Sequence, residues 1–141
     1  MTDLVTATIT RLAELKPSSL KLVAGLLSLN ALTTPPTDKM PAAYVMMSDE
    51  AYGPNGRLNV VRQTGTEAVR IVLMIASKAP QGDDVFNPIA APRAAVVAKL
   101  LGWQPDAEDG AVLLRSGAMI DVQATFLAYQ LIFFRDHSVK A

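Results

Sequence analysis

Apolar residues return at helical spacing near the start of the chain. Between residues 2 and 16 an apolar or small residue recurs every three or four positions, at Leu4, Val5, Thr8, Ile9, Leu12 and Leu15. This spacing predicts an amphipathic helix. Thr2 and Asp3 are residue types that suit its first turn, and the sequence "KPSS" is expected to end it.

A second helix is predicted in the stretch that ends at Gly102. Its apolar face is expected to consist of Val96, Val97, Leu100 and Leu101. Asn87 and Pro88 suit a helix start. Because Pro92 removes one backbone hydrogen bond, the regular helix is expected to begin near Pro92, after a loose first turn. Gly102 supplies the left-handed residue that ends a helix, Trp103 folds back onto the helix face, and Pro105 prevents the helix from resuming. These last three residues are predicted to form a structural anchor.

Shorter apolar stretches have the pattern of strands. Residues 41–48 ("PAAYVMMS") predict one strand, and residues 60–77 predict the longest one, whose end is apolar enough for a central strand covered on both faces. Residues 111–136 predict a short strand, a turn at Ser116-Gly117, another strand and a long final strand with both faces covered. Two alternatives stay open for residues 20–32: a short edge strand followed by a helix that opens at Gly25, or a single helix.

The order of these elements predicts one domain over residues 1–141 with an α/β (α+β) fold. We expect a mostly antiparallel mixed sheet of about four to five strands, packed with the N-terminal helix and with the helix that ends at Gly102 and Trp103.

Composition indicates a chain that a partner covers in part. Half of the 141 residues are apolar and the net charge is zero, with a mean hydropathy of +0.26. That is more apolar surface than a small domain hides easily. Lys and Arg form no cluster, which disfavours nucleic-acid binding. The chain has no cysteine, and its apolar runs are too short for a membrane span, so we expect a soluble intracellular protein without disulfides.

Candidate chemistry is sparse. The single histidine, His137, lies near the end of the chain in a segment expected to fray, and is interpreted as a solvated residue. The acidic groups fall beside Pro or Gly and are interpreted as solvated turns: Asp49/Glu50, Asp83/Asp84, and Asp106, Glu108 and Asp109. We therefore predict no catalytic residue, no metal site and no cofactor, and expect that the protein is not an enzyme.

Four segments, taken in order, resemble the tail terminator (tail-completion) proteins of long-tailed bacteriophages. They cover roughly residues 40–136 and read "MPAAYVMM", "VRQTGTEAVRIVLMIAS", "APRAAVVAKLLGWQPD" and "LLRSGAMIDVQATFLAYQLIFFRD". The Leu-Leu-Gly-Trp-Gln-Pro helix ending is the most distinctive of them. In such proteins Trp103 would lock the helix onto the sheet.

The resemblance implies a structural role in the virion. Such proteins assemble into a homohexameric ring that caps the tail tube, stops its polymerisation and provides the attachment surface for the neck of the DNA-filled head. The implied partners are other copies of the chain, the tail tube protein and a neck or head-completion protein, with assembly in the host bacterial cytoplasm. DNA would pass through the lumen without specific binding, and no membrane is involved.

Physical reasoning adds candidate interface residues. The polar stretch of residues 49–66 is a candidate arm that reaches a neighbouring subunit, with Tyr52, Arg57 and Arg62 as its contact residues. Four arginines, Arg57, Arg62, Arg70 and Arg115, could pair with Asp83 and Asp84 of the neighbour or lie on a solvated strand face. The loop of residues 78–87 is a candidate contact with tube or neck. Two other functions stay open: another neck or tail-tube ring component, and a small-molecule-binding or enzymatic domain.

Overall fold

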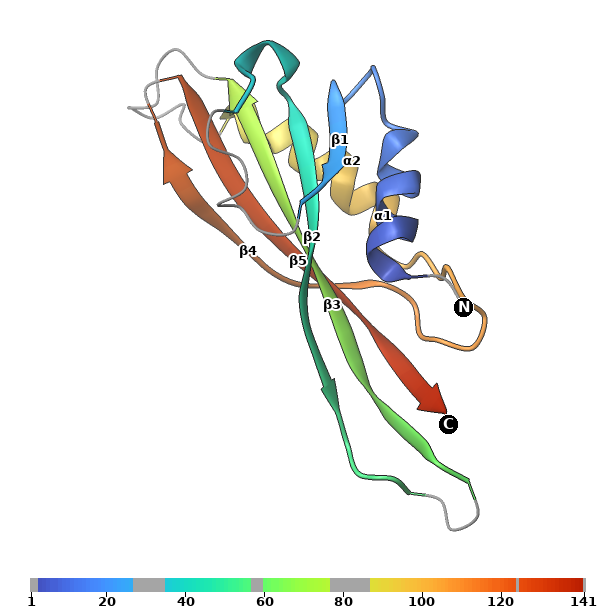
Figure 1. Ribbon diagram of the computed structural model, residues 1–141. Helices are drawn as coiled ribbons and strands as arrows, with labels where there is room; N and C mark the ends of the chain where they lie inside the picture. Colours follow the sequence, from blue (N-terminus) through green and yellow to red (C-terminus); the bar gives the residue numbers. More distant parts are fainter. Residues whose placement is uncertain (1–2, 27–34, 57–59, 77–86, 124, 141) are drawn as a thin grey trace.

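Two α-helices lie against one face of a five-stranded sheet in the computed structural model of the chain (Figure 1). The structure describes residues 3–26, 35–56, 60–76, 87–123 and 125–140. Within these ranges, no helix is both long and apolar enough to span a membrane. The α+β fold expected from the sequence is confirmed.

The elements follow the predicted order. The helices are α1 (Leu4–Ala13) and α2 (Asn87–Leu100), with a short 3-10 helix η2 (Thr37–Lys39), and the strands are β1 (Leu22–Gly25), β2 (Ala42–Tyr52), β3 (Arg62–Ala76), β4 (Leu113–Val122) and β5 (Phe126–Lys140). The strand order in the sheet is β1-β2-β3-β5-β4. Only the β1–β2 pair is parallel, so the sheet is mixed and mostly antiparallel, as predicted.

The central strand β3 is covered on both faces. Its residues Val69, Ile71 and Leu73 belong to the main core between the sheet and the two helices. Its residues Val72 and Met74 belong to a second apolar cluster on the opposite face, with Tyr44 among its members. This confirms the prediction from the almost continuous apolar end of β3, because a strand buried on one face alone would alternate with polar residues.

Helix α1 begins where the sequence predicts a cap. The backbone N–H of Thr6 donates to the Asp3 carboxylate at 3.1 Å, and the Thr6 hydroxyl donates to it at 2.8 Å. Both bonds lower the pKa of Asp3, and the bond from the Thr6 hydroxyl has the larger effect. Leu4 and Leu12 are buried in the main core. The amphipathic helix therefore forms for the reasons that its spacing indicates.

Helix α2 corrects two expectations. It is regular from Asn87, with Pro92 inside it, so the predicted loose first turn is wrong. The one hydrogen bond that Pro92 cannot donate would reach back to Pro88, at the start of the helix, where burial of Ile89 in the core holds the turn. Leu101 does not belong to the buried face, since it follows the last helical residue and is half exposed.

The end of α2 agrees with its sequence. Gly102 has a left-handed φ of +82°, and the Trp103 N–H donates to the carbonyl of Leu100 at 3.1 Å. The half-buried Trp103 ring packs against the main core, and the Arg11 guanidinium of α1 lies 5.2 Å from the ring centroid. Trp103 thus contacts both the main core and helix α1.

Residues 22–25 form an edge strand. β1 pairs with β2 in register from Leu22↔Ala42 to Gly25↔Val45, so the single-helix alternative is wrong. The strand-plus-helix alternative also predicts a helix from Gly25 to about residue 32; Gly25 is the last residue of β1, and residues 27–32 lie outside the described residues.

The turn predicted at Ser116-Gly117 is wrong, because β4 continues through it. Gly117 pairs with Leu131 of β5, and a Cβ built on Gly117 would lie 2.8 Å from the hydroxyl oxygen of Tyr129. The glycine makes room for the Tyr129 side chain across the strand pair and does not reverse the chain. β5 begins at Phe126 and runs to Lys140, past the expected end of the final strand.

Candidate functional site

Three strands continue beyond the helices as a projecting extension, which we call the arm (Figure 1). It comprises residues 48–52 of β2, 62–67 of β3 and 135–140 of β5, paired from Arg62↔Lys140 to Glu67↔Arg135 on one side of β3 and through Tyr52↔Gly65 on the other. The β2–β3 register shifts between Met47 and Glu50. Such a bulge bends a strand and strengthens its twist, and it lies where the arm leaves the body.

Within the described residues, the predicted polar stretch of residues 49–66 is strand at its two ends, in residues 49–52 and 62–66. Gly65 stands between Tyr52 and His137 in the sheet. A Cβ on Gly65 would collide with the carbonyl oxygen of Ala51 and would lie 2.7 Å from the Cα of Tyr52. Because Gly65 has no side chain, β2 can approach β3 closely. The ring centroids of Tyr52 and His137, the residues that flank Gly65 in the sheet, lie 6.2 Å apart. Burial, with the nearby Glu50 and Glu67 carboxylates, raises the pKa of Tyr52.

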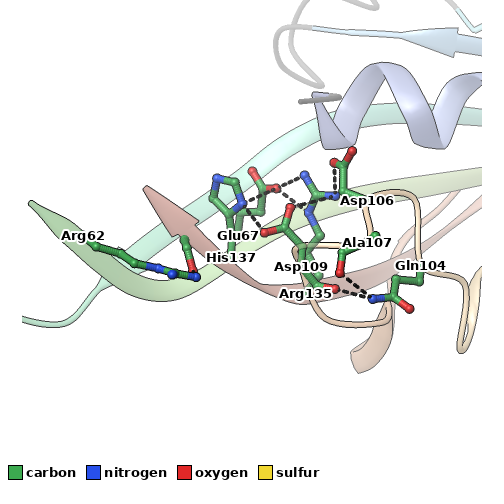
Figure 2. Close-up of polar contacts among 9 residues, drawn as sticks. Arg62, Glu67, Gln104, Asp106, Ala107, Asp109, Arg135 and His137 are labelled. Atoms are coloured by element: carbon green, nitrogen blue, oxygen red, sulfur yellow. Dashed lines mark hydrogen bonds and ion pairs between the residues drawn. The ribbon is translucent and has the colours of Figure 1, made fainter. Parts of the chain in front are cut away.

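A buried ion-pair cluster lies at the root of the arm (Figure 2). We call it the root cluster, and its members are Glu67, Asp106, Asp109, Arg135 and His137. The Arg135 side chain is only 1% exposed. Its Nε donates to Glu67 Oε1 at 2.5 Å, and its Nη1 lies 3.0 Å from Asp106 Oδ2 and 3.5 Å from Asp109 Oδ2. One guanidinium therefore joins three carboxylates from β3 and from the loop after α2.

His137 belongs to this cluster, which corrects its interpretation as a solvated residue. Its side chain is 7% exposed, and its Nδ1 lies 3.0 Å from Asp109 Oδ1. The segment does not fray because β5 pairs with β3 as far as Lys140. Asp106 and Asp109 are likewise not solvated turn residues, whereas Asp49, Glu50 and Glu108 are exposed as expected.

The loop after α2 is held by two further bonds, one to the arm and one within the loop itself. The Gly110 N–H donates to the carbonyl of Asp136 at 3.0 Å, and the Gln104 side chain donates to the carbonyl of Asp109 at 2.7 Å. The root cluster thus ties β3, β5 and the loop after α2 together. Removing one partner of a buried ion pair leaves an uncompensated charge, which is costly. The cluster therefore links the strands of the arm to the loop after α2.

The root cluster also has the residue types of a metal centre. Ligand atoms of Glu67, Asp109 and His137 all lie within 4.8 Å of one another. Both carboxylates, however, already pair with Arg135. A divalent cation would have to compete with the guanidinium for these carboxylates. The arrangement fits an ion-pair network better than a metal site.

A family model for the phage tail terminator protein matches residues 2–141. The chain belongs to the phage tail terminator family. This match confirms the resemblance described above and makes the chain a structural protein of the phage tail. Among solved structures, a chain of the virion of a native gene transfer agent particle is similar at 14% identity and a TM-score of 0.47, covering 99% of this chain and 100% of that one. No curated protein matches the sequence.

The structure of this tail terminator brings together two of the proposed interface residues. Tyr52 and Arg62 both lie on the arm, where the Arg62 N–H donates to the Asn55 side chain at 3.0 Å. Arg57, Asp83 and Asp84 lie outside the described residues. Arg70 lies within the sheet and donates to the Gln130 side chain at 2.5 Å.

A hollow of the tail terminator beside the root cluster is polar. It is lined by Thr64, Gly65, Thr66, Glu108, Gly110, Asp136, His137 and Ser138. Sites for small molecules are usually deep and mostly apolar. This hollow does not have that character.

The period of two along β5 could have revealed the buried charges. Leu127, Tyr129, Leu131 and Phe133 point into the main core, and continued alternation places Arg135 and His137 on the same face. The partners Asp106 and Asp109 give no such signal, because their position depends on how the loop folds over the arm.

Proposed function

We propose that the protein forms a homohexameric ring on the end of the completed tail tube. The ring would block further polymerisation of the tube and offer the surface to which the neck of the head attaches. The observation that carries this proposal is the match of almost the whole chain to the tail terminator family.

The arm supports the ring, because a ring needs two different faces on each subunit. A projecting extension on one side supplies one such face. Large apolar residues at its root, its tip and its last strand are exposed within the described residues: Met47, Val60, Val61 and Val139. An exposed apolar surface of this kind indicates a protein partner.

The other partners are the tail tube protein and a neck or head-completion protein, and the protein would be assembled into the virion in the host bacterial cytoplasm. DNA would pass through the lumen without specific binding. The net charge of zero supports this part of the proposal, since nucleic-acid affinity depends mainly on neutralising phosphates with Lys and Arg. A ring with this net charge would not attract DNA through its overall charge.

We further propose that Tyr52, Arg57 and Arg62 contact the neighbouring subunit, with Asp83 and Asp84 as ionic partners of the arginines. Gly102, Trp103 and Pro105 would act as the structural anchor that holds the end of α2. The contacts of Trp103 with the core and with Arg11 support that role.

Two measurements test the ring and the capping function separately. Light scattering after size exclusion, over a range of concentrations, should show a species of about 90 kDa, six times the chain mass of 15.1 kDa, and negative-stain images should show rings. Added to tail tube protein during polymerisation, the purified protein should shorten the tubes and appear at one end. Tubes of unchanged length and bare ends would overturn the capping function, whatever the mass in solution.

A further inference from the structure

We propose that neighbouring subunits join by β-sheet extension: the outer edge of β4 in one copy pairs, main chain to main chain, with the outer edge of β2 at residues 46–52 in the next copy. The proposal rests on the homomeric ring described above and specifies how its subunits meet. It names a second copy of this chain as the occupant of both edges.

The first edge is β4. It ends the strand order and pairs with β5 alone among the described strands. Its ten residues are mostly exposed, and three of the exposed side chains are large and apolar: Leu113, Ile120 and Val122. Such an edge presents unpaired N–H and C=O groups and is a template for another strand.

The second edge belongs to β2. β1 covers β2 only from Ala42 to Val45, and no described strand pairs with the same side of β2 from Met46 to Tyr52. Met47, on this open stretch, is 58% exposed. β2 therefore carries a free edge at the point where it enters the arm.

The two edges have the relation that a ring requires. They are different from each other and lie on opposite sides of one sheet (Figure 1), so each copy can offer one edge to each neighbour and the contact is heterologous. A partner of another kind would occupy one edge and leave the second without a match.

The edges also differ in position along the strands. β4 is level with residues 68–75 of β3, through the pairs Leu113↔Phe134↔Ala68 and Val122↔Leu127↔Ile75. The open part of β2 is level with residues 65–70, through Tyr52↔Gly65 and Met46↔Arg70. Joined copies would therefore be displaced along the strand direction. A constant displacement of this kind tilts the strands and is what allows a sheet to close on itself.

Charge disfavours the wrong pairings. The open part of β2 carries Asp49 and Glu50, both exposed, so two such edges would place like charges opposite each other. β4 carries Asp121 as its one acidic residue and Arg115, which pairs with Asp49 of the same subunit at 3.2 Å. A β4 edge therefore brings fewer carboxylates to the β2 edge than a second β2 edge would.

Cross-linking between two single-cysteine variants tests the pairing, because the natural chain has no cysteine. Ser48→Cys marks the β2 edge and Ala118→Cys marks β4; both side chains are small and exposed. The two variants are mixed and treated with a short bismaleimide, in solution and on tail tubes. We expect the mixture to give a covalent dimer in a yield at least roughly tenfold higher than either variant alone gives. The reason is that direct pairing brings Cβ atoms of facing strands to about 5 Å.

A second test blocks the β4 edge with a charge. Ile120→Lys should raise the concentration at which the ring dissociates by roughly tenfold or more, because lysine on an edge strand opposes pairing. The matched control is Ala13→Lys, which places the same charge on an exposed apolar residue at the end of helix α1 and should leave that concentration unchanged. Urea unfolding of both variants checks that the subunit fold is intact.

The outcomes separate this proposal from the ring itself. Rings that form and cap tubes but yield no mixed dimer would overturn edge pairing and leave the proposed function standing. Equal dimer from Ala118→Cys alone would show that two β4 edges meet, which also overturns it. A wild-type protein that stays monomeric in solution and leaves tube ends bare would overturn both.

Discussion

Arg135 is the side chain on which the root cluster depends. It is almost fully buried and is the partner of three carboxylates, those of Glu67, Asp106 and Asp109. In Arg135→Gln these carboxylates, which are 3–20% exposed, would lose the guanidinium that compensates their charge. We expect the free energy of unfolding to fall by about 3–5 kcal/mol, the cost of breaking a buried pair from one side. Urea unfolding measures this loss.

Arg115 provides the matched control. Its Nη1 lies 3.2 Å from Asp49 Oδ1, with both side chains substantially exposed. Exposed pairs of this kind contribute about 0–1 kcal/mol. Arg115→Gln should therefore change stability by less than about 1 kcal/mol. Equal losses of stability in the two variants would show that the root cluster stabilises the fold no more than an exposed ion pair does.

Tyr44 offers a test of opposite sign. Its hydroxyl is buried and has no hydrogen-bond partner among the described residues. Tyr44→Phe removes an unsatisfied polar group, so stability should stay the same or rise by about 1 kcal/mol. A loss larger than about 1 kcal/mol in urea unfolding would show that the hydroxyl bonds to something.

The same residue gives a dependence on pH. Burial raises the pKa of Tyr44 above its ordinary value of 10.0, because the phenolate would lose its hydration. The preference of the folded state for the neutral phenol is fully present below pH 10 and is lost as the pH rises from 10 toward the folded pKa. Tyr44→Phe should remove this share of the alkaline loss of stability, measured by urea unfolding at a series of pH values.

At the scale of elements, Gly65 decides how closely the strands of the arm approach. A Cβ there would meet the backbone of Ala51 and Tyr52, and backbone cannot move aside as a flexible side chain can. Gly65→Ala should therefore loosen β2 from β3 in the arm and increase hydrogen exchange of the arm amides, while the main core stays protected.

The control for Gly65→Ala lies at the end of the same hairpin. A Cβ on Gly56 would meet nothing within 4 Å, so Gly56→Ala should leave the exchange of the arm amides unchanged. If Gly65→Ala also left the arm protected, the close approach of the strands would not depend on the missing side chain.

Trp103 tests the end of α2. Its ring is only half-buried, between the main core and Arg11 of α1. Trp103→Ala should therefore cost about 2 kcal/mol, less than the 3–5 kcal/mol typical of a fully buried aromatic residue. Because Trp103 is the only tryptophan, unfolding of this variant is followed by circular dichroism. A loss below about 0.5 kcal/mol, the size of an ordinary surface substitution, would show that Trp103 is not an anchor.

Elements with a complete local signal were predictable. α1 combines apolar spacing with a cap, and β3 has an apolar run too continuous for an exposed strand. The sequence around Gly117 misled because glycine marks both turns and close approaches; here the space is taken by Tyr129, twelve residues later. No local pattern carries a contact of that kind. The same reason hid Asp106 and Asp109, which meet Arg135 only after the loop folds onto the arm.

At the scale of the whole molecule, the excess of apolar residues has two destinations. One part is buried on the second face of the sheet, around Tyr44, Val72 and Met74. Another part stays exposed on β4, at Ile120 and Val122, and at the root of the arm, at Met47. Composition predicted that a partner covers part of the chain, but only the arrangement of the strands shows where apolar surface and open strand edges coincide.

Arg62 tests whether the arm takes part in assembly. It lies in the outermost pair of the arm, opposite Lys140, far from the main core. In Arg62→Glu the subunit should fold as before, whereas a contact between the arm and an acidic group of the neighbour would become a repulsion of like charges. We expect the species of six copies to give way to smaller ones in light scattering, with little change in urea unfolding.

Lys21→Glu serves as the control for this charge reversal. Lys21 is exposed and lies just before β1, outside the arm, so the same change of net charge should leave the mass unchanged. Loss of the ring in both variants would point to net charge rather than to the arm. If the ring survives in Arg62→Glu, Arg62 is not an interface residue. The open strand edges of β2 and β4 would then remain as the proposed contacts between subunits.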